Sequence, residues 1–316
     1  MTTSPKAVVR PAALRPGATL AVLSPASTPK PDLVQRGIAH LQNLGYRTVL
    51  GKHALDRGPL YYAGTLEQRL EDFHAAFADP AIDGIVCTRG GWGSAELLPH
   101  LDAALIRAHP KAFISYSDHT ALHSWLHNEA GLVTFHGPMA AADFSREGGI
   151  DNASWAHSLG GDAAWSLGAA DGLRVLRAGV AHGRLQGGCL SILAESLGTP
   201  YALRIADSIL FLEDIGTKAY QWDRMLLHLR YAGVLENVRG IVFGDMHQCA
   251  AVAEHDYLER AILHSLRDFD GPIAIGLPSG HVDGSNITLP LGIAVKLDLG
   301  EAGNPRMHFL EAAVKV

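Results

Sequence analysis

The stretch Ala112-Phe-Ile-Ser-Tyr-Ser117-Asp-His-Thr120 joins an apolar strand pattern to a helical pattern, which continues over residues 121–126. A serine on a strand-to-helix turn projects its hydroxyl from the edge of the sheet. The free N–H groups of the new helix lie close to it and can stabilise an oxyanion. Ser117 is therefore a candidate nucleophile. Serine and aspartate are also ordinary N-cap residues, so Ser117 or Asp118 could instead simply begin a helix.

Strand and helix patterns alternate outward from this turn. Strands are predicted over residues 19–25, 46–50, 83–88 and 112–116, with helices over 31–44, 66–77 and 95–108. A further strand over 132–135 precedes Gly137-Pro138. Such alternation implies right-handed crossovers between parallel strands. We expect an α/β fold with a doubly wound parallel sheet in the N-terminal half.

The periodicity fades between about residues 140 and 182. A linker is therefore expected over 141–182, between an N-terminal domain over 1–140 and a C-terminal α/β domain over 183–316. In the C-terminal domain, strands are predicted over 209–213, 240–244, 272–276 and 293–298, and helices over about 189–197, 220–232 and 253–267.

Two strand patterns of the second half also end in polar residues. Residues 209–212 run directly into Glu213-Asp214, and residues 272–278 into Ser279-Gly280-His281. Because α/β proteins bind ligands at the carboxyl ends of their strands, Ser117, Glu213 and His281 can converge at one edge. Together they would supply a nucleophile, an orienting carboxylate and a base. For His281 alone, the alternative is an imidazole that local backbone satisfies.

The glycine-rich segment Thr88-Arg-Gly-Gly-Trp-Gly-Ser94 lies between a strand and a helix pattern. Glycines there allow close backbone approach to a ligand and leave N–H groups free to form one half of an oxyanion hole. The alternative is a tight turn that only needs positive φ. The GxGxxG register is absent here, and no GxxxxGK[ST] occurs in the chain, so neither a dinucleotide site nor a P-loop is expected.

A metal site is not expected. His119, His123 and His127 recur every four residues, but on a helix the outer pair lies about 12 Å apart and cannot share one tetrahedral ion. Two of them could, yet no HExxH glutamate accompanies them. The three cysteines have no CxxC spacing and indicate reduced thiols of a cytoplasmic protein, not a disulfide framework or a zinc site.

Composition favours a small-molecule partner. The 316 residues carry a net charge of −6 and no dense Lys/Arg run, which argues against nucleic acid or an anionic membrane surface. No stretch reaches the apolar length of a membrane span, and the N-terminus has no uninterrupted apolar segment of the kind found in secretory signals.

Short motifs along residues 18–300 occur together, in the same order, in one known family. They are Arg89-Gly-Gly-Trp-Gly-Ser, Tyr116-Ser-Asp-His-Thr-Ala-Leu, Gly137-Pro, Gly187-Gly-Cys-Leu-Ser, Gly198-Thr-Pro-Tyr, Leu210-Phe-Leu-Glu-Asp-Ile, Asp223-Arg-Met, Gly240-Ile-Val-Phe-Gly-Asp and Gly280-His with Asn286-Ile-Thr-Leu-Pro-Leu-Gly. In these motifs the chain resembles the LD-carboxypeptidases, the muramoyl-tetrapeptide carboxypeptidase family of serine peptidases.

The resemblance implies a flavodoxin-like N-terminal domain that carries Ser117 and a mixed α/β, barrel-like C-terminal domain that carries Glu213 and His281. It implies a homodimer without cofactor or metal. In the implied triad, Ser117 is the nucleophile, His281 the base and Glu213 its orienter. The amides of Asp118 and Gly91 would form the oxyanion hole, and Arg89, Gly90 and Trp92 would bind substrate.

Three positions depart from the family pattern. Ser115 stands where glycine is usual, Cys189 where asparagine is common, and Thr217 where glutamate is usual. None is a member of the implied triad, but each touches its surroundings. We therefore expect the type of reaction to follow the family pattern more closely than the choice of substrate does.

The function expected from residues and resemblance together is that of a cytoplasmic, metal-independent serine carboxypeptidase. It would release the terminal D-alanine of a murein tetrapeptide during peptidoglycan recycling. The same triad could instead cleave a peptidyl-nucleotide antibiotic, as microcin C immunity proteins do. From another class, a non-catalytic solute-binding protein would also have two α/β domains, but it would need no such triad.

Overall fold

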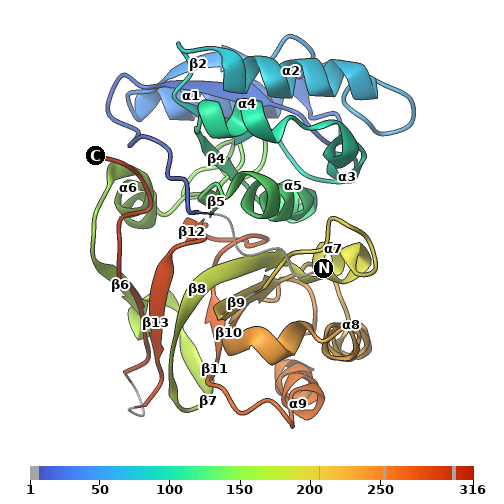
Figure 1. Cartoon of the computed structure of the whole chain (residues 1–316), viewed down its shortest axis with the longest axis vertical. Helices are drawn as coiled ribbons and strands as arrows, with labels where there is room; N and C mark the ends of the chain where they lie inside the picture. Colours follow the sequence, from blue (N-terminus) through green and yellow to red (C-terminus); the bar gives the residue numbers. More distant parts are fainter. Residues whose placement is uncertain (1–6, 206, 252–253, 301–303) are drawn as a thin grey trace.

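Five parallel strands of the N-terminal half form most of the first sheet in the computed structural model, which describes residues 7–205, 207–251, 254–300 and 304–316 (Figure 1). Their order, β2-β1-β3-β4-β5, is that of flavodoxin-like sheets, which confirms the expected fold class. A strand from near the end of the chain, β12, adds antiparallel to β5. The strands are β1 (Thr19–Leu23), β2 (Arg47–Leu50), β3 (Gly84–Cys87), β4 (Ala112–Ser115), β5 (Thr134–His136) and β12 (Leu289–Leu291).

Helices cover both faces of this sheet, because successive side chains of a strand point to opposite faces. Leu20 and Val22 of β1 belong to the core that includes α1, whereas Ala21 and Leu23 belong to the core that includes α2, α4 and α5. The sheet is therefore doubly wound, as predicted. The helices are α1 (Pro31–Asn43), α2 (Leu66–Ala78), α3 (Ser94–Leu97), α4 (Ala103–Ala108) and α5 (Thr120–Trp125).

The prediction of one helix over 95–108 is wrong, because this segment forms two short helices with a turn between them. A 3-10 turn, η1 (Leu98–His100), separates α3 from α4 and contains Pro99, which lacks the N–H that a continuing helix needs. The Asp102 carboxylate then accepts the N–H groups of Ala104 and Leu105 at 2.8 and 3.0 Å, which caps a new helix.

The second sheet has eight strands in the order β6-β14-β13-β8-β9-β10-β11-β7. Its four central strands, β8 to β11, are parallel, and antiparallel strands flank them on both sides. Helices α8 and α9 contact each other, and with α7 they cover the parallel strands (Figure 1). The elements are β6 (Trp165–Gly168), β7 (Arg174–Arg177), β8 (Val180–Cys189), α7 (Leu190–Ser196), β9 (Ser208–Glu213), α8 (Ala219–Tyr231), β10 (Val238–Gly244), α9 (His255–Ser265), β11 (Ile273–Leu277), β13 (Ala294–Asp298) and β14 (Arg306–Phe309).

The segment 141–182, expected as a linker, is folded structure instead. Its helix α6 (Asn152–Gly160) packs on the first unit, where Trp155 Nε1 donates to Tyr46 at 3.0 Å, and its strands β6 and β7 lie at the two ends of the eight-stranded sheet. Each of these strands has four residues, and in β7 none of the four is fully buried. Edge strands that are short and half exposed carry little apolar periodicity, so the sequence pattern did not reveal them.

The two sheets meet where their parallel strands end. The loop after β4 lies against the end of β8: the backbone N–H of Cys189 donates to Thr120 Oγ1 at 3.0 Å. Gly188 has φ +142°, and a Cβ there would lie 2.6 Å from the same oxygen, so only glycine permits this approach. Contacts between α5 and α7 extend the junction (Figure 1). This junction brings the carboxyl ends of β4, β9 and β11 together.

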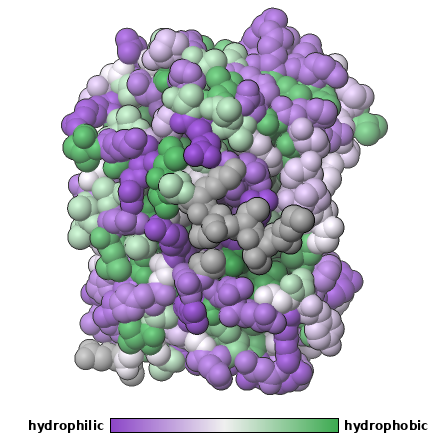
Figure 2. Space-filling view, in the orientation of Figure 1, coloured by the Kyte–Doolittle hydropathy of each residue, from purple (hydrophilic) through white to green (hydrophobic). Residues whose placement is uncertain are grey.

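Hydrophilic and hydrophobic side chains are interspersed over both units on the face shown in Figure 2. Within the described part of the chain, none of the helices combines the length and the apolar character that crossing a bilayer requires.

Candidate active site

Ser117 occupies a strained position at the end of β4. Its φ is +66°, in the left-handed region that residues other than glycine rarely adopt. It is the first residue of a 3-10 turn, η2 (Ser117–His119), that leads into α5. Such strain clusters at functional sites and costs about 1–3 kcal/mol. Of the two interpretations of this turn, a strained nucleophile position agrees better with the geometry than an ordinary helix cap, because helix caps are extended and unstrained.

The glycine loop packs directly on this serine. A Cβ built on Gly90 would lie 2.8 Å from Ser117 Cβ and 2.9 Å from Ser117 Oγ. The Asp118 carboxylate joins the two segments, since its Oδ2 accepts the backbone N–H of Ser94 at 2.9 Å. A side chain at position 90 would therefore fill the space beside the Ser117 hydroxyl.

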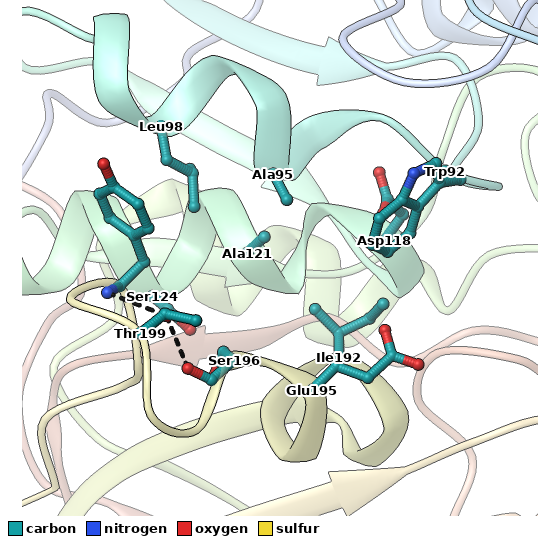
Figure 3. A pocket seen from close by; sticks show the side chains of 11 residues that line it. Trp92, Ala95, Leu98, Asp118, Ala121, Ser124, Ile192, Glu195, Ser196 and Thr199 are labelled. Atoms are coloured by element: carbon teal, nitrogen blue, oxygen red, sulfur yellow. Dashed lines mark hydrogen bonds between the residues drawn. The ribbon is translucent and has the colours of Figure 1, made fainter.

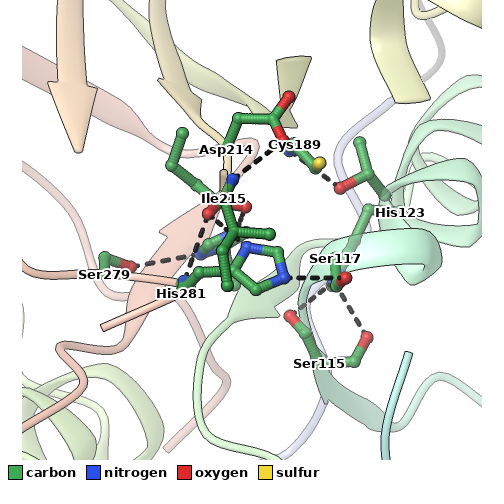
Figure 4. A network of polar contacts seen from close by, with 12 residues as sticks. Ser115, Ser117, His123, Cys189, Asp214, Ile215, Ser279 and His281 are labelled. Atoms are coloured by element: carbon green, nitrogen blue, oxygen red, sulfur yellow. Dashed lines mark hydrogen bonds and ion pairs between the residues drawn. The ribbon is translucent and has the colours of Figure 1, made fainter. Parts of the chain in front are cut away.

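His281 bridges the two other residues of the predicted constellation. Its Nε2 lies 3.0 Å from Ser117 Oγ (Figure 4). Its Nδ1 lies 2.7 Å from Glu213 Oε2. The same carboxylate oxygen accepts the backbone N–H of His281 at 3.1 Å. Because a carboxylate only accepts, Nδ1 carries the proton and Nε2 is left to accept the hydroxyl proton of Ser117. The structure thus brings the three sequence-predicted residues into one hydrogen-bonded chain.

Burial and charge shift the pKa values of Glu213 and His281 in opposite directions. Glu213 is 1% exposed, and burial alone would raise its pKa, but the facing His281 and His136 hold that pKa well below its usual range. Burial alone would lower the pKa of His281, yet the Glu213 carboxylate outweighs it and raises that pKa above its ordinary value. The carboxylate therefore stays ionised and favours the imidazolium that forms when His281 accepts a proton.

A second histidine, which the sequence reasoning missed, faces the other oxygen of Glu213. His136 Nε2 lies 3.6 Å from Glu213 Oε1, and both side chains are fully buried. Its Nδ1 lies 3.1 Å from Ser279 Oγ, which donates its own proton to the Ile287 carbonyl at 2.8 Å. Ser279 can then only accept from Nδ1, which fixes the orientation of the ring. The sequence did contain a signal for His136. This residue lies at the end of a strand pattern, as Ser117 and Glu213 do, and directly before Gly137-Pro138.

The carboxylate next to Glu213 points elsewhere, because successive side chains along a strand point to opposite faces. Asp214 Oδ2 accepts the N–H of Ser191 at 2.9 Å, at the start of α7, and its Oδ1 accepts the N–H of Ile215 at 2.8 Å (Figure 4). Asp214 therefore holds backbone, not the imidazole of His281.

Several hydrogen-bond donors in and next to the glycine loop have no partner among the described residues. No described residue offers an acceptor to the Gly91 N–H, and the Asp118 N–H lies in the first turn of η2, where a helix leaves its amides without partners. The Arg89 side chain is exposed, and its guanidinium has no partner within the described ranges. Trp92 is 38% exposed, with its backbone N–H held by Ser27 Oγ at 3.1 Å.

The three periodic histidines do not form a common site. His123 contacts Ser115 and Thr134, and His127 contacts Gln186. Burial lowers the pKa of His119 and of His127 to about 4, and that of His123 to about 3. In the described ranges, no group of three or more His, Cys, Asp or Glu side chains is arranged to hold a metal ion.

Comparison with known proteins places the whole arrangement in a family. Residues 20–137 match the family model for the LD-carboxypeptidase N-terminal domain, and residues 182–297 match that for its C-terminal domain. The probable murein peptide carboxypeptidase of Bacillus subtilis is 36% identical over 92% of both chains. The murein tetrapeptide carboxypeptidase of Pseudomonas aeruginosa is 34% identical over 83% of this chain and 87% of its own.

Among solved structures, an MccF-like protein from Bacillus anthracis superposes with a TM-score of 0.87 at 26% identity, over 95% of this chain and 99% of that one. Both family domains, the long curated relatives and the shared two-unit fold agree. This chain belongs to the LD-carboxypeptidase family.

Proposed function

We propose that this protein is a serine carboxypeptidase that releases the terminal D-alanine of murein tetrapeptides by hydrolysing the bond after the L-centre of the diamino acid. The observation that carries the proposal is the chain Ser117–His281–Glu213, with contacts of 3.0 and 2.7 Å, on a left-handed serine at a strand end. Relatives named for murein peptide and murein tetrapeptide cleavage supply the substrate class.

In the proposed first step, Ser117 Oγ attacks the carbonyl carbon while His281 Nε2 takes the hydroxyl proton. Glu213 keeps Nδ1 protonated and stabilises the imidazolium. The negative oxygen of the tetrahedral intermediate would face the amides of Asp118 and Gly91. Collapse breaks the C–N bond, His281 gives its proton to the amine of D-alanine, and an acyl-enzyme remains.

In the second step a water molecule attacks the acyl-enzyme while His281 takes one of its protons. Collapse of this second intermediate breaks the ester, and His281 returns the proton to Ser117 Oγ. The products are D-alanine and the shortened peptide. All protons and electrons balance over the two steps. Apart from water and substrate, the groups involved are the three triad side chains and the backbone amides of Asp118 and Gly91.

A carboxypeptidase must also recognise the free carboxylate of its substrate. We assign this to Arg89, whose exposed guanidinium has no partner in the described part of the chain and belongs to the loop that packs on Ser117. A guanidinium binds a carboxylate with two parallel hydrogen bonds. Gly90 would leave room for the substrate, and Trp92 would border it.

Mass spectrometry of the products tests the proposal. Purified protein is incubated with free and UDP-linked murein tetrapeptides, the corresponding D-alanine amide and a peptidyl-nucleotide, with Ser117→Ala as control. We expect loss of one alanine from the tetrapeptides and little turnover of the amide, which lacks the carboxylate. Cleavage of only the peptidyl-nucleotide would favour the immunity-type reaction instead, which the MccF-like neighbour makes the second candidate. Binding without turnover of any compound would favour a solute-binding protein.

The family resemblance also leads us to propose a cytoplasmic homodimer. Sedimentation velocity of the purified protein tests the oligomeric state, and a monomer at micromolar concentration would contradict it.

A further inference from the structure

Two cavities adjoin the residues of the proposed triad. One, of about 120 Å³, lies beside the turn of Ser117, where Trp92 and Asp118 line one end (Figure 3). The other, of about 210 Å³, is lined by His281 and by Arg146, whose side chain is 34% exposed. The proposed mechanism uses His281 but gives Arg146 no role.

His281 lies on a loop that crosses from one unit of the protein to the other. Residues 278–288 connect β11 of the second sheet with β12 of the first. They form neither a helix nor a regular strand, and side chains on loops are held less precisely than those on strands and helices. The position of the imidazole therefore depends on contacts that other segments supply.

The residue before His281 is fixed by Asn286. The Asn286 side chain accepts the Gly280 N–H at 3.0 Å and donates to the Gly280 carbonyl at 3.1 Å. Asn286 is fully buried, and its own backbone pairs with the segment 149–151 through two hydrogen bonds of 3.1 Å. The loop is thus held on the N-terminal side of His281.

Arg146 holds the residues that follow His281. Its guanidinium donates to the Val282 carbonyl at 2.8 Å and to the Asp283 carbonyl. It also donates to Asp143 Oδ1 at 3.0 Å. Hydrogen bonds from a charged donor are about twice as strong as neutral ones, and the planar guanidinium fixes their direction. One side chain therefore binds two successive carbonyls directly after the base.

Asp143 connects this guanidinium to the first sheet. It is 1% exposed, and its Oδ2 accepts the N–H of Met139 at 3.0 Å. Burial raises the pKa of Asp143, and the Met139 N–H and Arg146 oppose this rise. The N–H of Ala141 donates to the carbonyl of Thr88 at 2.8 Å, at the start of the glycine loop. Hydrogen bonds thus connect the base of the glycine loop, through the segment 139–146, to the loop of His281.

We infer that Arg146 is a positioning residue for His281, and that the Asp143–Arg146 pair holds the His281 loop against the unit that carries Ser117. Arg146 acts through main-chain carbonyls, since its hydrogen bonds go to these and to Asp143. Without it the loop can shift and lengthen the 3.0 Å contact between His281 and Ser117. The inference rests on the proposed function, because it concerns the support of the proposed base.

Release of D-alanine from a murein tetrapeptide by Arg146→Ala tests the inference. We expect kcat to fall by about 10²-fold with KM within about threefold, since a misplacement of about 1 Å costs that much. Free guanidinium ion at millimolar concentration should restore part of kcat, because Arg146 lines a cavity that the ion can enter. Arg146→Lys should lose less activity than Arg146→Ala, since it keeps the charge but not the planar donor group.

Arg184→Ala is the matched control. Arg184 also donates to a carbonyl, that of Gly292 at 2.8 Å, and to a carboxylate, that of Glu311, but its side chain hydrogen-bonds no residue of the loop 278–288. It should keep kcat within about twofold and show no response to guanidinium. An unchanged kcat in Arg146→Ala would overturn the positioning role. So would a raised KM with unchanged kcat, which would make Arg146 a substrate contact.

NMR of the histidine ring nitrogens separates this inference from the proposed function, because it needs no substrate. The signals of His281 should shift in Arg146→Ala and stay in place in Arg184→Ala. If no tetrapeptide is hydrolysed, the proposed function fails, and the NMR result alone decides the positioning role: unshifted signals overturn it. If Arg146→Ala does not fold, Arg146→Lys takes its place. A lower kcat with unchanged KM and shifted His281 signals then supports the role, and values equal to those of the unaltered protein overturn it.

Discussion

The two sheets hold their parts of the site under opposite backbone conditions. The first sheet ends in Ser117, whose left-handed φ of +66° is strained and whose surroundings are a short turn and a glycine loop. The second sheet ends in Glu213, the last residue of the regular strand β9, which is fully buried, hydrogen-bonded to His281 and 3.6 Å from His136. The comparison teaches that, of the three proposed catalytic residues, only Ser117 has a left-handed φ. Glu213 lies on a regular strand, and the left-handed residue beside His281 is Gly280, which adopts its φ of +95° without steric cost.

Removing the strained group should have the largest effect. We expect Ser117→Ala to lower kcat by about 10⁶, because without a nucleophile the base and its carboxylate have nothing to activate. Circular dichroism should show an unchanged fold, since the hydroxyl contributes little to the core. An alanine variant that keeps more than a few per cent of the activity would show that the serine mechanism is wrong.

Loss of charge in the second sheet should have the next largest effect. Glu213→Gln should lower kcat by roughly 10³ to 10⁴ with a much smaller change in KM, as for the corresponding carboxylate of other serine triads. Asp214→Asn is the matched control, because Asp214 holds the start of α7 and not His281. Steady-state kinetics of both variants decide the assignment, and an inactive Asp214→Asn beside a near-normal Glu213→Gln would reverse it.

The second histidine at Glu213 sharpens the comparison further. We expect His136→Gln to lower kcat by about tenfold with KM nearly unchanged, since it removes a buried imidazole that lies 3.6 Å from the Glu213 carboxylate and helps to keep the pKa of that carboxylate low. His123→Gln removes an equally buried histidine that contacts Ser115 and Thr134 but not Glu213, so it should lose stability without this loss of kcat. Equal kcat in both variants, compared at temperatures where both are folded, would reduce His136 to a core residue.

The pH dependence of kcat/KM should show how the Glu213 carboxylate affects the pKa of His281. Only neutral His281 can accept the proton of Ser117, so activity falls as pH drops through the pKa of His281. Burial lowers this pKa, but Glu213 outweighs it, and the acid limb should lie above the ordinary histidine value of about 6.5. In Glu213→Gln the burial remains and the charge is gone, so the limb of the residual activity should move to lower pH. An acid limb that stays in place would contradict the electrostatic role of Glu213.

The smallest effect concerns the strain itself. Glycine adopts a left-handed φ without steric cost, so Ser117→Gly should unfold with a free energy about 1 kcal/mol higher than Ser117→Ala. Chemical denaturation of the two inactive variants measures this difference. If the alanine variant is at least as stable, the turn is not strained in solution.

The same contrast explains what could be predicted from sequence. The turn at Ser117 is local, so the change from an apolar run to a helical pattern reveals it, and Glu213 and His281 follow apolar strands in the same way. His136 also ends a strand pattern, but what it contributes depends on its contacts with Ser279 and Glu213, which are distant in the sequence. The strands β6, β7 and β14 lack long apolar runs because they lie at or near the margins of the sheet. The resemblance to a family supplied the roles that pattern alone left open.

The insertion of β12 into the first sheet has a consequence for the order of folding. Residues 289–291 pair with β5, which lies roughly 150 positions earlier in the chain. Pairing over so large a separation is slow, and during synthesis it must wait until residues 289–291 have left the ribosome. His281 becomes available at the same late stage. A chain synthesised only as far as the first sheet can therefore form the serine turn, but it lacks the proposed base, so we expect it to have no peptidase activity.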